Sequence, residues 1–420
     1  MIDIGLVRKD PDFVRKNLER RHIETPLEKL IGIDIRWRED RANLDALRNR
    51  RNVASAEIAA LKKEKKDAGA KISEMKTISD EITGLEKEIE KLDGERNGFL
   101  LATPNILDES VPDGRDSANN VVLRKWGDVR KPSFKLKGHT ELIEEKGLAD
   151  IERAARATGA RFYYLKGDLF RLALALETFT IDFLTKKGFL AMETPFMLKR
   201  EAIQGAISMA DFGDVIFKVD GEDLYLIGTA EHTLLAYHMG EIFEPGELPK
   251  LYCGYSTNFR KEAGAHGKDM KGIFRVRQFD KVEQFIFCKP EESPKWHEAL
   301  IENAELLFQA LLIPYRVIVL CGGDTGRVSA KTYDLEAWMP AQDEYREVVS
   351  ASNCTDYQAR RLNIRYRTPE GTRFPHTLNS TAIAIQRTLV GIIENYQTED
   401  GGIVVPEVLR PYMNGRERIG

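Results

Sequence analysis

The longest regular pattern in the chain is a 3–4 spacing of apolar residues between Leu27 and Thr103, a span without proline. The apolar positions are Leu44, Leu47, Ala54, Ile58 and Leu61, followed by Met75, Ile78, Ile82, Leu85, Ile89, Leu92 and Phe99. A period near 3.5 is typical of helices that pack along one seam. Since residues 66–70 offer a reversal, we expect an antiparallel helical hairpin, with legs of about 27 residues that reach about 40 Å.

Basic side chains gather near the expected tip of this hairpin. They are Arg48, Arg50, Arg51, Lys62, Lys63, Lys65, Lys66 and Lys71, and Glu64 and Asp67 only partly neutralise them. One interpretation is a cationic arm that grips the phosphate backbone of a nucleic acid. The other is a solvated coiled-coil face or a dimerisation hairpin. The charge pattern by itself favours this second interpretation, because charge runs on long helices are usually solvated.

Pro104 and Pro112 interrupt the helical pattern, and strands and helices mix beyond them. Turn residues and periodicity predict a linker over 119–133, a helix over 172–187, strands over 188–195, 224–228, 251–253 and 314–320, and a helix over 381–396. We therefore expect a helical domain over residues 1–110 and a domain of mixed strands and helices over residues 111–420, in the fold class α+β.

The most informative polar feature is a pair of expected strands that flank a glycine-rich run from Ala263 to Gly272. Side chains two apart on a strand share a face. The residues expected on one face are Arg260, Glu262, Arg275, Phe279 and Glu283, while Val276 and Val282 are expected in the core. Arginines suit phosphate oxygens, a ring suits base stacking and carboxylates accept from N–H donors, so this set suits a nucleoside triphosphate and an amine. The alternative is an amphipathic hairpin with a solvated charged face.

A hydroxyl and a carboxylate follow the expected strand at 224–227. After Gly228, which allows close backbone approach, Thr229 and Glu231 are placed to hold an ammonium group. The alternative is a helix cap, with Thr229 as N-cap and Glu231 in the first turn. We expect His232 to be a satisfied polar residue, since no second histidine or cysteine lies at metal-ligand spacing.

Two further charged residues stand in apolar surroundings and need partners. Glu347 lies in a mostly apolar run, where either a magnesium ion on triphosphate oxygens or a buried ion pair would satisfy it. Arg387 lies on a helix that is apolar nearly all round, so it must meet a carboxylate or a phosphate. The chain lacks the glycine-rich signature of a P-loop, and none typical of a dinucleotide-binding fold follows a strand.

The composition of the chain limits the kinds of ligand and cellular compartment that are compatible with it. The 420 residues carry a net charge of -4, so any polyanion binding must come from a local patch. The 4 cysteines lie far apart without a CxxC pair, which indicates neither a disulfide framework nor a zinc site and fits a reducing cytosol. No apolar run approaches the roughly 18 residues that a membrane span needs, and the N-terminus has no apolar signal core. We expect a protein without membrane association.

Together the motifs resemble, in their order, the signature motifs of class II aminoacyl-tRNA synthetases, and most specifically those of the seryl-tRNA synthetase family. Pro195 closes a unit that resembles the dimer-interface motif, residues 259–283 resemble the second motif and residues 379–387 the third. The specific match lies in the Thr229-Ala230-Glu231 triplet and in residues 278–283, 352–361 and 394–397. The resemblance covers essentially the whole chain, including the hairpin, which is the tRNA-binding arm in that family.

The resemblance implies an antiparallel sheet flanked by helices and a cytoplasmic homodimer. It implies that ATP with Mg²⁺ activates L-serine to seryl-adenylate and that serine is transferred to the 3′ end of tRNA(Ser), with tRNA(Sec) left open as a second substrate. The rarer methanogen-type enzyme of this specificity carries zinc. The missing cysteine spacing argues against that type, so no zinc is expected.

Carried over by position, the resemblance also implies residue roles. Arg260 would hold the α-phosphate, with Arg275 and Arg387 on the distal phosphates, and these three arginines would be catalytic. Glu262 and Phe279 would bind adenine, Val276 would lie by the nucleotide through its backbone, and Lys261, Val348 and Val349 would complete the ATP site. Glu347 and Ser350 would coordinate magnesium. Thr229, Ala230 and Glu231 would hold the serine ammonium, and Glu283 and Thr381 the serine hydroxyl. The arm residues would be Arg48, Arg50, Arg51, Lys62, Lys63, Lys65 and Lys66.

A site built around the substrate hydroxyl is expected to reject alanine, because Glu283 would be left buried and unpaired. Several positions depart from the family pattern, namely Gly228, Thr257, Asn258, Arg277, Val349 and Ala351. Strand parity places Arg277 on the pocket face, where it could alter ATP affinity.

Three other functions compete. A ligase that loads an amino acid onto a carrier protein would lack the long arm. A non-catalytic paralogue would be expected to lose the pocket charges, which are all present. A coiled-coil interaction protein would show no serine-dependent pyrophosphate exchange.

Overall fold

The computed structural model describes residues 1–129, 132–208, 215–262, 269 and 271–420. The chain divides into two compact units. The helical unit comprises Asp3–Leu18 and Glu24–Thr103, and the sheet unit comprises Met1–Ile2, Glu19–Ile23 and Pro104–Gly420. Within the described ranges, no helix is both long and apolar enough to cross a membrane.

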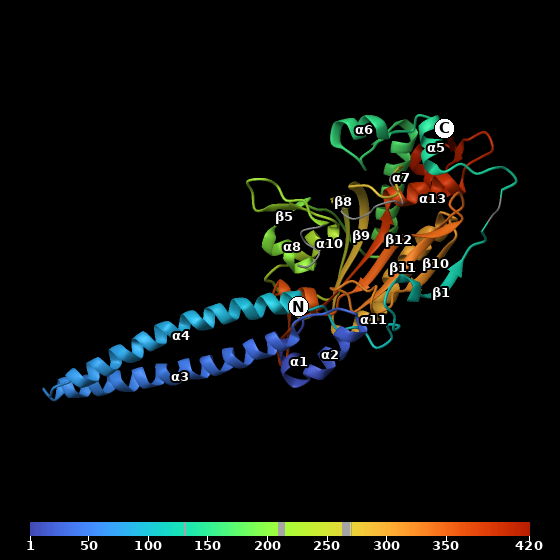
Figure 1. The fold of residues 1–420 in the computed structure, drawn as a ribbon. Coiled ribbons are helices and arrows are strands. Elements are labelled where there is room, and N and C mark those ends of the chain that lie inside the picture. Colours follow the sequence, from blue (N-terminus) through green and yellow to red (C-terminus); the bar gives the residue numbers. More distant parts are fainter. Residues whose placement is uncertain (130–131, 209–214, 263–268, 270) are drawn as a thin grey trace. The chain divides into compact units, whose positions relative to one another are not determined.

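The helical unit is built around two long helices, α3 (Leu27–Lys63) and α4 (Gly69–Ala102), which a short turn joins and which pack on each other (Figure 1). Shorter helices α1 (Ile4–Lys9) and α2 (Pro11–Arg20) precede them. The seam buries Leu44, Ala54, Ile58, Ile78, Ile82, Ile89 and Leu92, as the apolar period predicts. With 37 and 34 residues, the helices are longer than the expected 27. In the first turns of α3, Ile31, Ile33 and Ile35 alternate along the sequence instead of following the 3–4 spacing, so that period does not mark the start of the helix.

Arg96 stands between Leu92 and Phe99 at a position of the 3–4 spacing, and it pairs with a buried carboxylate near the start of α3. The side chain of Asp34 is 4% exposed, and it pairs with Arg8 at 2.7 Å, with Arg38 at 3.3 Å and with Arg96 at 3.6 Å. The Arg96 guanidinium also lies 3.9 Å from the centroid of the Trp37 ring. Burial acts to raise the pKa of Asp34, but the Arg8 hydrogen bond and the three positive charges hold that pKa below its ordinary value.

The sheet unit is organised around an eight-stranded sheet. In spatial order its strands are β1 (Val121–Trp126), β10 (Tyr315–Val319), β11 (Lys331–Met339), β12 (Glu344–Asn353), β15 (His376–Ala384), β9 (Gln278–Cys288), β8 (Lys250–Phe259) and β4 (Leu190–Glu193). All neighbours pair antiparallel except β4 and β8, which pair parallel at one edge. The predicted α+β fold with a mainly antiparallel sheet is confirmed.

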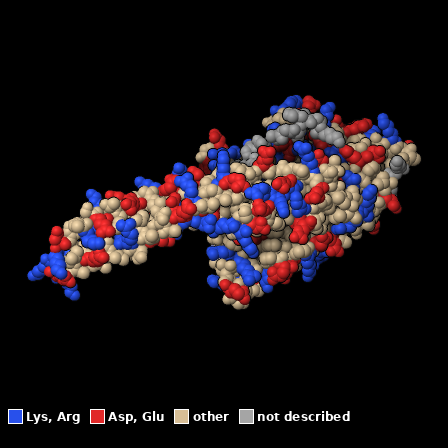
Figure 2. Space-filling model, turned by 60° about the horizontal axis from the view of Figure 1, so that its bottom comes forward, with Lys and Arg blue, Asp and Glu red and all other residues tan. Residues whose placement is uncertain are grey.

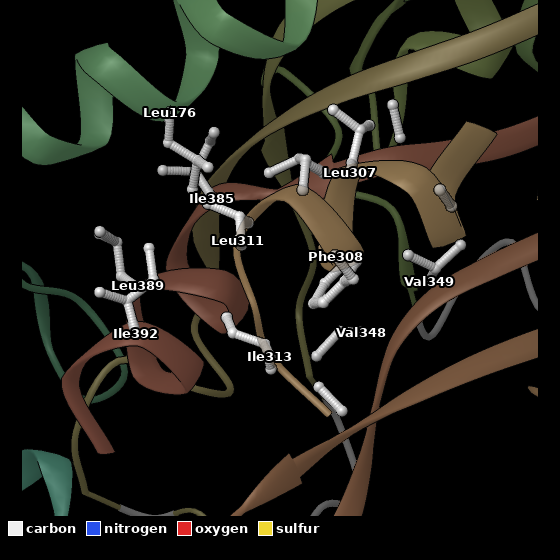
Figure 3. Close-up of a cluster of buried hydrophobic side chains, with 14 of the residues drawn as sticks. Leu176, Leu307, Phe308, Leu311, Ile313, Val348, Val349, Ile385, Leu389 and Ile392 are labelled. Atoms are coloured by element: carbon white, nitrogen blue, oxygen red, sulfur yellow. The ribbon is translucent and has the colours of Figure 1, made fainter. Parts of the chain in front are cut away.

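Helices α7 (Gly167–Lys186), α11 (Ser293–Ala310) and α13 (Ile385–Asn395) pack against this sheet. Figure 3 shows part of the core cluster, to which the helices contribute Leu176, Phe308 and Leu389 and strand β12 contributes Val348 and Val349. Each of these side chains is at most 2% exposed. Burial of this size stabilises the fold by roughly 1.5–3 kcal/mol for each large apolar side chain. The core therefore holds rigid the strands that carry the polar residues discussed below.

Three expectations about local structure are wrong. Residues 121–126 form strand β1 rather than a linker, because they pair with β10 at the sheet edge although their side chains are mostly exposed. Thr381 lies on β15, and α13 begins only at Ile385. Strand β9 begins at Gln278, so Arg275 precedes the strand. Most of the glycine-rich run, residues 263–268 and 270, lies outside the described residues.

Residues 19–23 belong to the sheet unit, although the chain on both sides of them belongs to the helical unit. Arg21 is 1% exposed and donates to four backbone carbonyls of the sheet unit. The acceptors are Asn105 at 2.8 Å, Thr325 at 3.2 Å, Gly326 at 3.3 Å and Ser329 at 2.5 Å. Burial lowers the pKa of Arg21 to about 10, so the guanidinium remains charged at neutral pH.

Candidate active site

A cavity of about 320 Å³ lies among β9, β12, β15, the start of α13 and the short helix α10 (Ala230–Ala236). Its walls include most of the predicted site residues, from segments far apart in the sequence. These are Thr229, Glu231, Arg260, Glu262, Arg275, Val276, Phe279, Glu283, Glu347, Val348, Ser350, Thr381 and Arg387. The predicted convergence of distant charged groups is therefore present.

Three predicted residues do not line this cavity. Ala230 is buried in a separate apolar cluster beside β8 and β9, and Val349 packs into the main core. Lys261 lies past the end of β8, where its backbone N–H donates to Val215 O at 3.0 Å. Arg277 is also absent from the cavity walls. Arg277 precedes the first residue of β9, so the alternation of side chains along a strand does not apply to it. The prediction that Arg277 lies on the pocket face is wrong.

Two arginines meet in the cavity. Burial and the neighbouring positive charge of Arg387 lower the pKa of Arg260, although Arg260 remains charged. Arg260 Nε donates to Gly228 O at 3.2 Å, and its guanidinium lies 5.2 Å from the Phe279 ring centroid. Arg387 Nη1 lies 3.2 Å from Glu347 Oε1, so the predicted partner of Arg387 is a carboxylate. Two close cations in a confined space favour a ligand with several negative charges.

The cavity wall also contains a carboxylate, Glu262, that two arginines orient. Glu262 follows β8 with a φ of 51°, a left-handed conformation that a residue other than glycine rarely adopts. Its Oε2 accepts from Arg275 Nε at 2.5 Å and lies 3.9 Å from Arg161 Nη1. The ring and the oriented carboxylate oxygen together provide a stacking surface and an acceptor for an N–H group.

A β-bulge brings Glu347 to the cavity. In the β11–β12 pairing, Leu335 lies opposite Val349 while Glu336 lies opposite Glu347, so Val348 is an extra residue. Simple alternation would put Glu347 and Ser350 on opposite faces. The bulge puts both in the cavity wall. Glu347 is 49% exposed there, so the alternative of a buried ion pair is wrong.

The chemistry around Glu347 and Ser350 fits a hard divalent cation. On β11, Asp334 lies opposite Ser350. Among the described residues, Asp334 Oδ1 has no hydrogen-bond partner although it is buried. Magnesium is bound in proteins by one or two carboxylates together with substrate phosphates. The Glu347 carboxylate and the Ser350 hydroxyl supply oxygen ligands of this kind, and the buried Asp334 carboxylate lies next to Ser350.

Two buried carboxylates, Glu231 and Glu283, also line the cavity. Thr229 caps α10 by accepting from the Glu231 N–H at 3.2 Å, so the helix-cap alternative is correct and Thr229 still lines the cavity. Burial and the negative charge of Glu283 raise the pKa of Glu231 to about 7. Burial also raises the pKa of Glu283, which the Lys281 ammonium opposes. Lys281 Nζ contacts Glu283 Oε2 directly, so Glu283 has a partner without any substrate.

Comparison with known proteins shows which family the chain resembles. The family model described as "tRNA synthetase class II core domain (G, H, P, S and T)" matches residues 216–396, and the "Seryl-tRNA synthetase N-terminal domain" matches residues 1–107. The chain is 48% identical to a protein named serine--tRNA ligase from Methanocella arvoryzae, over 99% of this chain and 100% of that protein. A protein of the same name from Nitrosopumilus maritimus is 47% identical over 100% of both chains.

The chain belongs to the seryl-tRNA synthetase family. A crystal structure of seryl-tRNA synthetase from Pyrococcus horikoshii complexed with ATP is similar at a TM-score of 0.95 and 45% identity, covering 100% of this chain and 99% of that one. A Giardia lamblia prolyl-tRNA synthetase shares the fold alone, with a TM-score of 0.57 at 15% identity over 66% of this chain and 58% of that one.

The departures from the family pattern leave the cavity walls intact. A Cβ atom at Gly228 would lie 3.6 Å from Arg260 Nε, an ordinary contact, so sterics do not require glycine there. What the position supplies is its carbonyl, which accepts from Arg260. His232, whose Nδ1 accepts from the Gly228 N–H at 3.4 Å, is buried, and burial lowers its pKa to about 3. It is a satisfied neutral residue, as expected.

Sequence reasoning missed six residues of the cavity walls, namely Phe274, Lys281, Ser352, Asn379, Ala384 and Gln386. Lys281 had a usable signal, because it lies between Phe279 and Glu283 on the same face of β9. Phe274 precedes the strand, and its ring lies 5.2 Å from the Arg387 guanidinium. No spacing rule predicts that contact, since the two residues come from different elements.

Proposed function

We propose that this chain activates L-serine with ATP to form seryl-adenylate and transfers the seryl group to the 3′ end of tRNA(Ser). The observation that carries the proposal is that one cavity is lined by two arginines, an aromatic ring, an oriented carboxylate and two buried carboxylates, one of which is paired with a lysine. ATP offers phosphates, a base and an N–H donor group, and serine offers an ammonium and a hydroxyl. Family membership supports the same reaction.

In this proposal, ATP lies along the wall formed by Arg260, Phe279 and Arg387. Adenine stacks on Phe279, and its amino group donates to Glu262. Arg260 holds the α-phosphate, and Arg387 with Arg275 holds the distal phosphates. The mutual repulsion of Arg260 and Arg387 in the free protein is relieved by the triphosphate, which favours the charged ligand over a neutral nucleoside. Backbone atoms of Val276 and Val348 complete the nucleotide wall.

Glu347 and Ser350 would hold Mg²⁺ on the phosphate oxygens, where the ion would neutralise charge that develops as pyrophosphate leaves. The bulge at Val348 supports this assignment, because it is what aligns both oxygen ligands with one cavity. Class II synthetases use ATP with a divalent metal, and these oxygen ligands suit magnesium better than a softer ion.

Serine would enter between the two buried carboxylates. Glu231 with Thr229 would accept from the ammonium, and Glu283 with Thr381 would bind the hydroxyl. The serine carboxylate then attacks the α-phosphorus in line and pyrophosphate leaves. Positioning and charge stabilisation do most of this work. Alanine would lose the hydroxyl hydrogen bond, but Lys281 keeps Glu283 paired, so discrimination is weaker than an unpaired carboxylate would give.

The hairpin would bind the tRNA. Figure 2 shows Lys and Arg side chains interspersed with acidic ones along the hairpin and gathered at its end. Arg48 pairs with Glu86 at 2.8 Å, Arg50 lies 3.8 Å from Glu74, and Lys66 pairs with Glu64 at 2.7 Å. Within the described hairpin, no ion pair involves Arg51, Lys62, Lys63 or Lys65, and the three lysines are exposed. These unpaired cations are the better candidates for phosphate contacts.

A homodimer in the cytoplasm completes the proposal. Helix α7 exposes Phe170 and Leu174 by 49% and 46%, and Leu190 on the edge strand β4 is 59% exposed. Exposed apolar side chains beside an unpaired strand edge favour association with another copy of the sheet unit. Light scattering of the purified protein tests this.

Aminoacylation of total tRNA with each amino acid in turn tests the reaction. We expect charging with serine alone and pyrophosphate exchange that depends on serine. Exchange without charging would favour a ligase for another carrier. The absence of both would favour a binding protein and refute the proposal.

A further inference from the structure

The two buried carboxylates of the cavity have chemically different partners. The closest side-chain donor to Glu231 is a neutral amide, and the closest to Glu283 is a cation. Both carboxylates are in the same wall, and each negative charge raises the cost of the other. The choice of partner therefore decides which of them keeps an uncompensated charge.

The neutral partner is Gln358, at the start of the short helix α12 (Tyr357–Arg361). Its Nε2 donates to Glu231 Oε1 at 2.6 Å, while its Oε1 accepts from Thr377 Oγ1 at 2.7 Å. Gln358 and Thr377 are both 0% exposed. A carboxylate has no proton to donate when ionised, so the amide must turn its nitrogen to Glu231. The Thr377 hydroxyl holds the other side of the amide in the matching orientation.

The cationic partner is Lys281, on the same face of β9 as Glu283. The side chains of Lys281 and Glu283 are 8% and 2% exposed, and they form an ion pair within the cavity wall. The charges of these two residues cancel. Among the described residues, Glu231 has a hydrogen bond but no ion-pair partner, apart from the more general influence of Arg260 and Lys281. Cys354, whose pKa burial raises, is a neutral neighbour of Glu231.

We propose that Gln358 and Lys281 are positioning residues that give the two carboxylates different roles in substrate binding. Gln358 orients Glu231 as the uncompensated anion that receives the substrate ammonium. Lys281 neutralises Glu283, which then accepts only a neutral hydroxyl. Serine matches this pattern with one positive and one neutral donor. The inference rests on the proposed function and explains how one cavity distinguishes an ammonium from a hydroxyl.

The first test replaces the amide, with Gln358→Leu assayed by serine-dependent pyrophosphate exchange. Loss of a hydrogen bond to a charged group should raise the KM for serine about 10–100-fold and leave the KM for ATP unchanged. Because Glu231 loses its donor, the acid limb of kcat/KM for serine should move to higher pH, so that alkaline pH restores activity. A merely structural defect would lower activity equally at every pH.

Two variants control for the cost of removing a buried amide. Gln284 is also 0% exposed, but its side chain faces α11 and bonds Leu300 O and Asn303. Gln284→Leu should reduce thermal stability without moving the acid limb. Thr377→Val keeps the shape and removes the hydroxyl that holds Gln358, so it should move the acid limb in the same direction by a smaller amount. An acid limb unmoved in both Gln358→Leu and Thr377→Val overturns the role of Gln358.

The second test concerns Lys281. In Lys281→Met, Glu283 loses its cation, so the cavity offers two uncompensated carboxylates. L-2,3-diaminopropionate, in which an amine replaces the serine hydroxyl, should then gain at least about tenfold in kcat/KM relative to serine. An unchanged ratio contradicts the role of Lys281. Wild-type protein that shows no serine-dependent exchange refutes the proposed function instead, so the two failures are distinguishable.

Discussion

The hairpin and the cavity use the same charged residue types in opposite surroundings. On the two long helices of the hairpin, Arg48 and Glu86 are 44% and 46% exposed, so their pair contributes at most about 1 kcal/mol. In the cavity, Lys281 and Glu283 are almost fully buried, and removing either partner would leave an uncompensated charge. A buried charge can therefore select a ligand with one particular charge and hydrogen-bonding pattern. An exposed charge contributes only to the overall electrostatic potential around the protein.

The strongest contrast is expected for Arg260. Arg260→Ala should slow serine-dependent pyrophosphate exchange by roughly 10²–10³, the usual loss for one charge-stabilising donor in a confined site. Thermal unfolding should show that the variant is folded. Arg277→Ala is the matched control, since Arg277 does not line the cavity. Near-normal exchange in the Arg260 variant would refute its role on the α-phosphate.

The hairpin should respond to charge number rather than to one residue. Replacing Lys62, Lys63 and Lys65 with Ala should raise the KM for tRNA up to about 100-fold. The slope of the logarithm of tRNA affinity against the logarithm of salt concentration should become shallower by about three. Amino-acid activation should be unchanged. Replacing Arg48 and Arg50, which already face Glu86 and Glu74, should have a smaller effect. Equal effects of the two sets would remove the distinction between paired and unpaired cations.

Asp34 shows that the helical unit also contains a buried charge. Asp34→Asn should reduce the free energy of unfolding by about 2 kcal/mol, because Arg8, Arg38 and Arg96 lose their shared anion. The folded pKa of Asp34 is depressed, so its stabilisation is present above the unfolded pKa and is lost as pH falls through the folded value. Urea unfolding followed by circular dichroism measures both. The exposed Asp45→Asn is the control, with an expected change below about 0.5 kcal/mol.

The last prediction concerns the pH dependence of the wild-type protein. Glu231 must be ionised to accept an ammonium, and its pKa is raised to about 7. The value of kcat/KM for serine should therefore fall by about tenfold per pH unit below that pKa. The KM for ATP should not follow the same curve. A flat serine profile between about pH 5.5 and pH 8 would show that Glu231 is not the ammonium partner.

Periodicity predicted the long elements well, because a repeated apolar stripe has few ways to be buried. The seam from Leu44 to Leu92 follows from spacing alone. Strands β8 and β9 pair as expected, but β8 ends at Phe259, before Arg260 and Glu262, which were expected on the strand. Alternation also predicted that Phe279 and Glu283 share a face. The same alternation places Lys281 between Phe279 and Glu283 on that face, and Lys281 does line the cavity.

Other features depend on contacts that no local pattern contains. The bulge at Val348 breaks the alternation that would separate Glu347 from Ser350. Gln358 and Glu231 are 127 residues apart, and only the packed fold brings the amide to the carboxylate. Val349 was expected beside the nucleotide, but it packs into the core because its neighbour is the bulged residue. Single irregularities in a strand thus decide which side chains reach the cavity.

The segment Glu19–Ile23 has a practical consequence for dissecting the protein. Because it returns to the sheet unit before the hairpin begins, the hairpin is an insertion rather than a detachable prefix. A fragment that starts at Pro104 would lack the Arg21 guanidinium, which donates to four carbonyls. Gly326 O would keep its bond from the Ser329 N–H, whereas Asn105 O, Thr325 O and Ser329 O would lose this donor. A minimal fragment designed for amino-acid activation must therefore retain Glu19–Ile23 and connect Ile23 to Pro104.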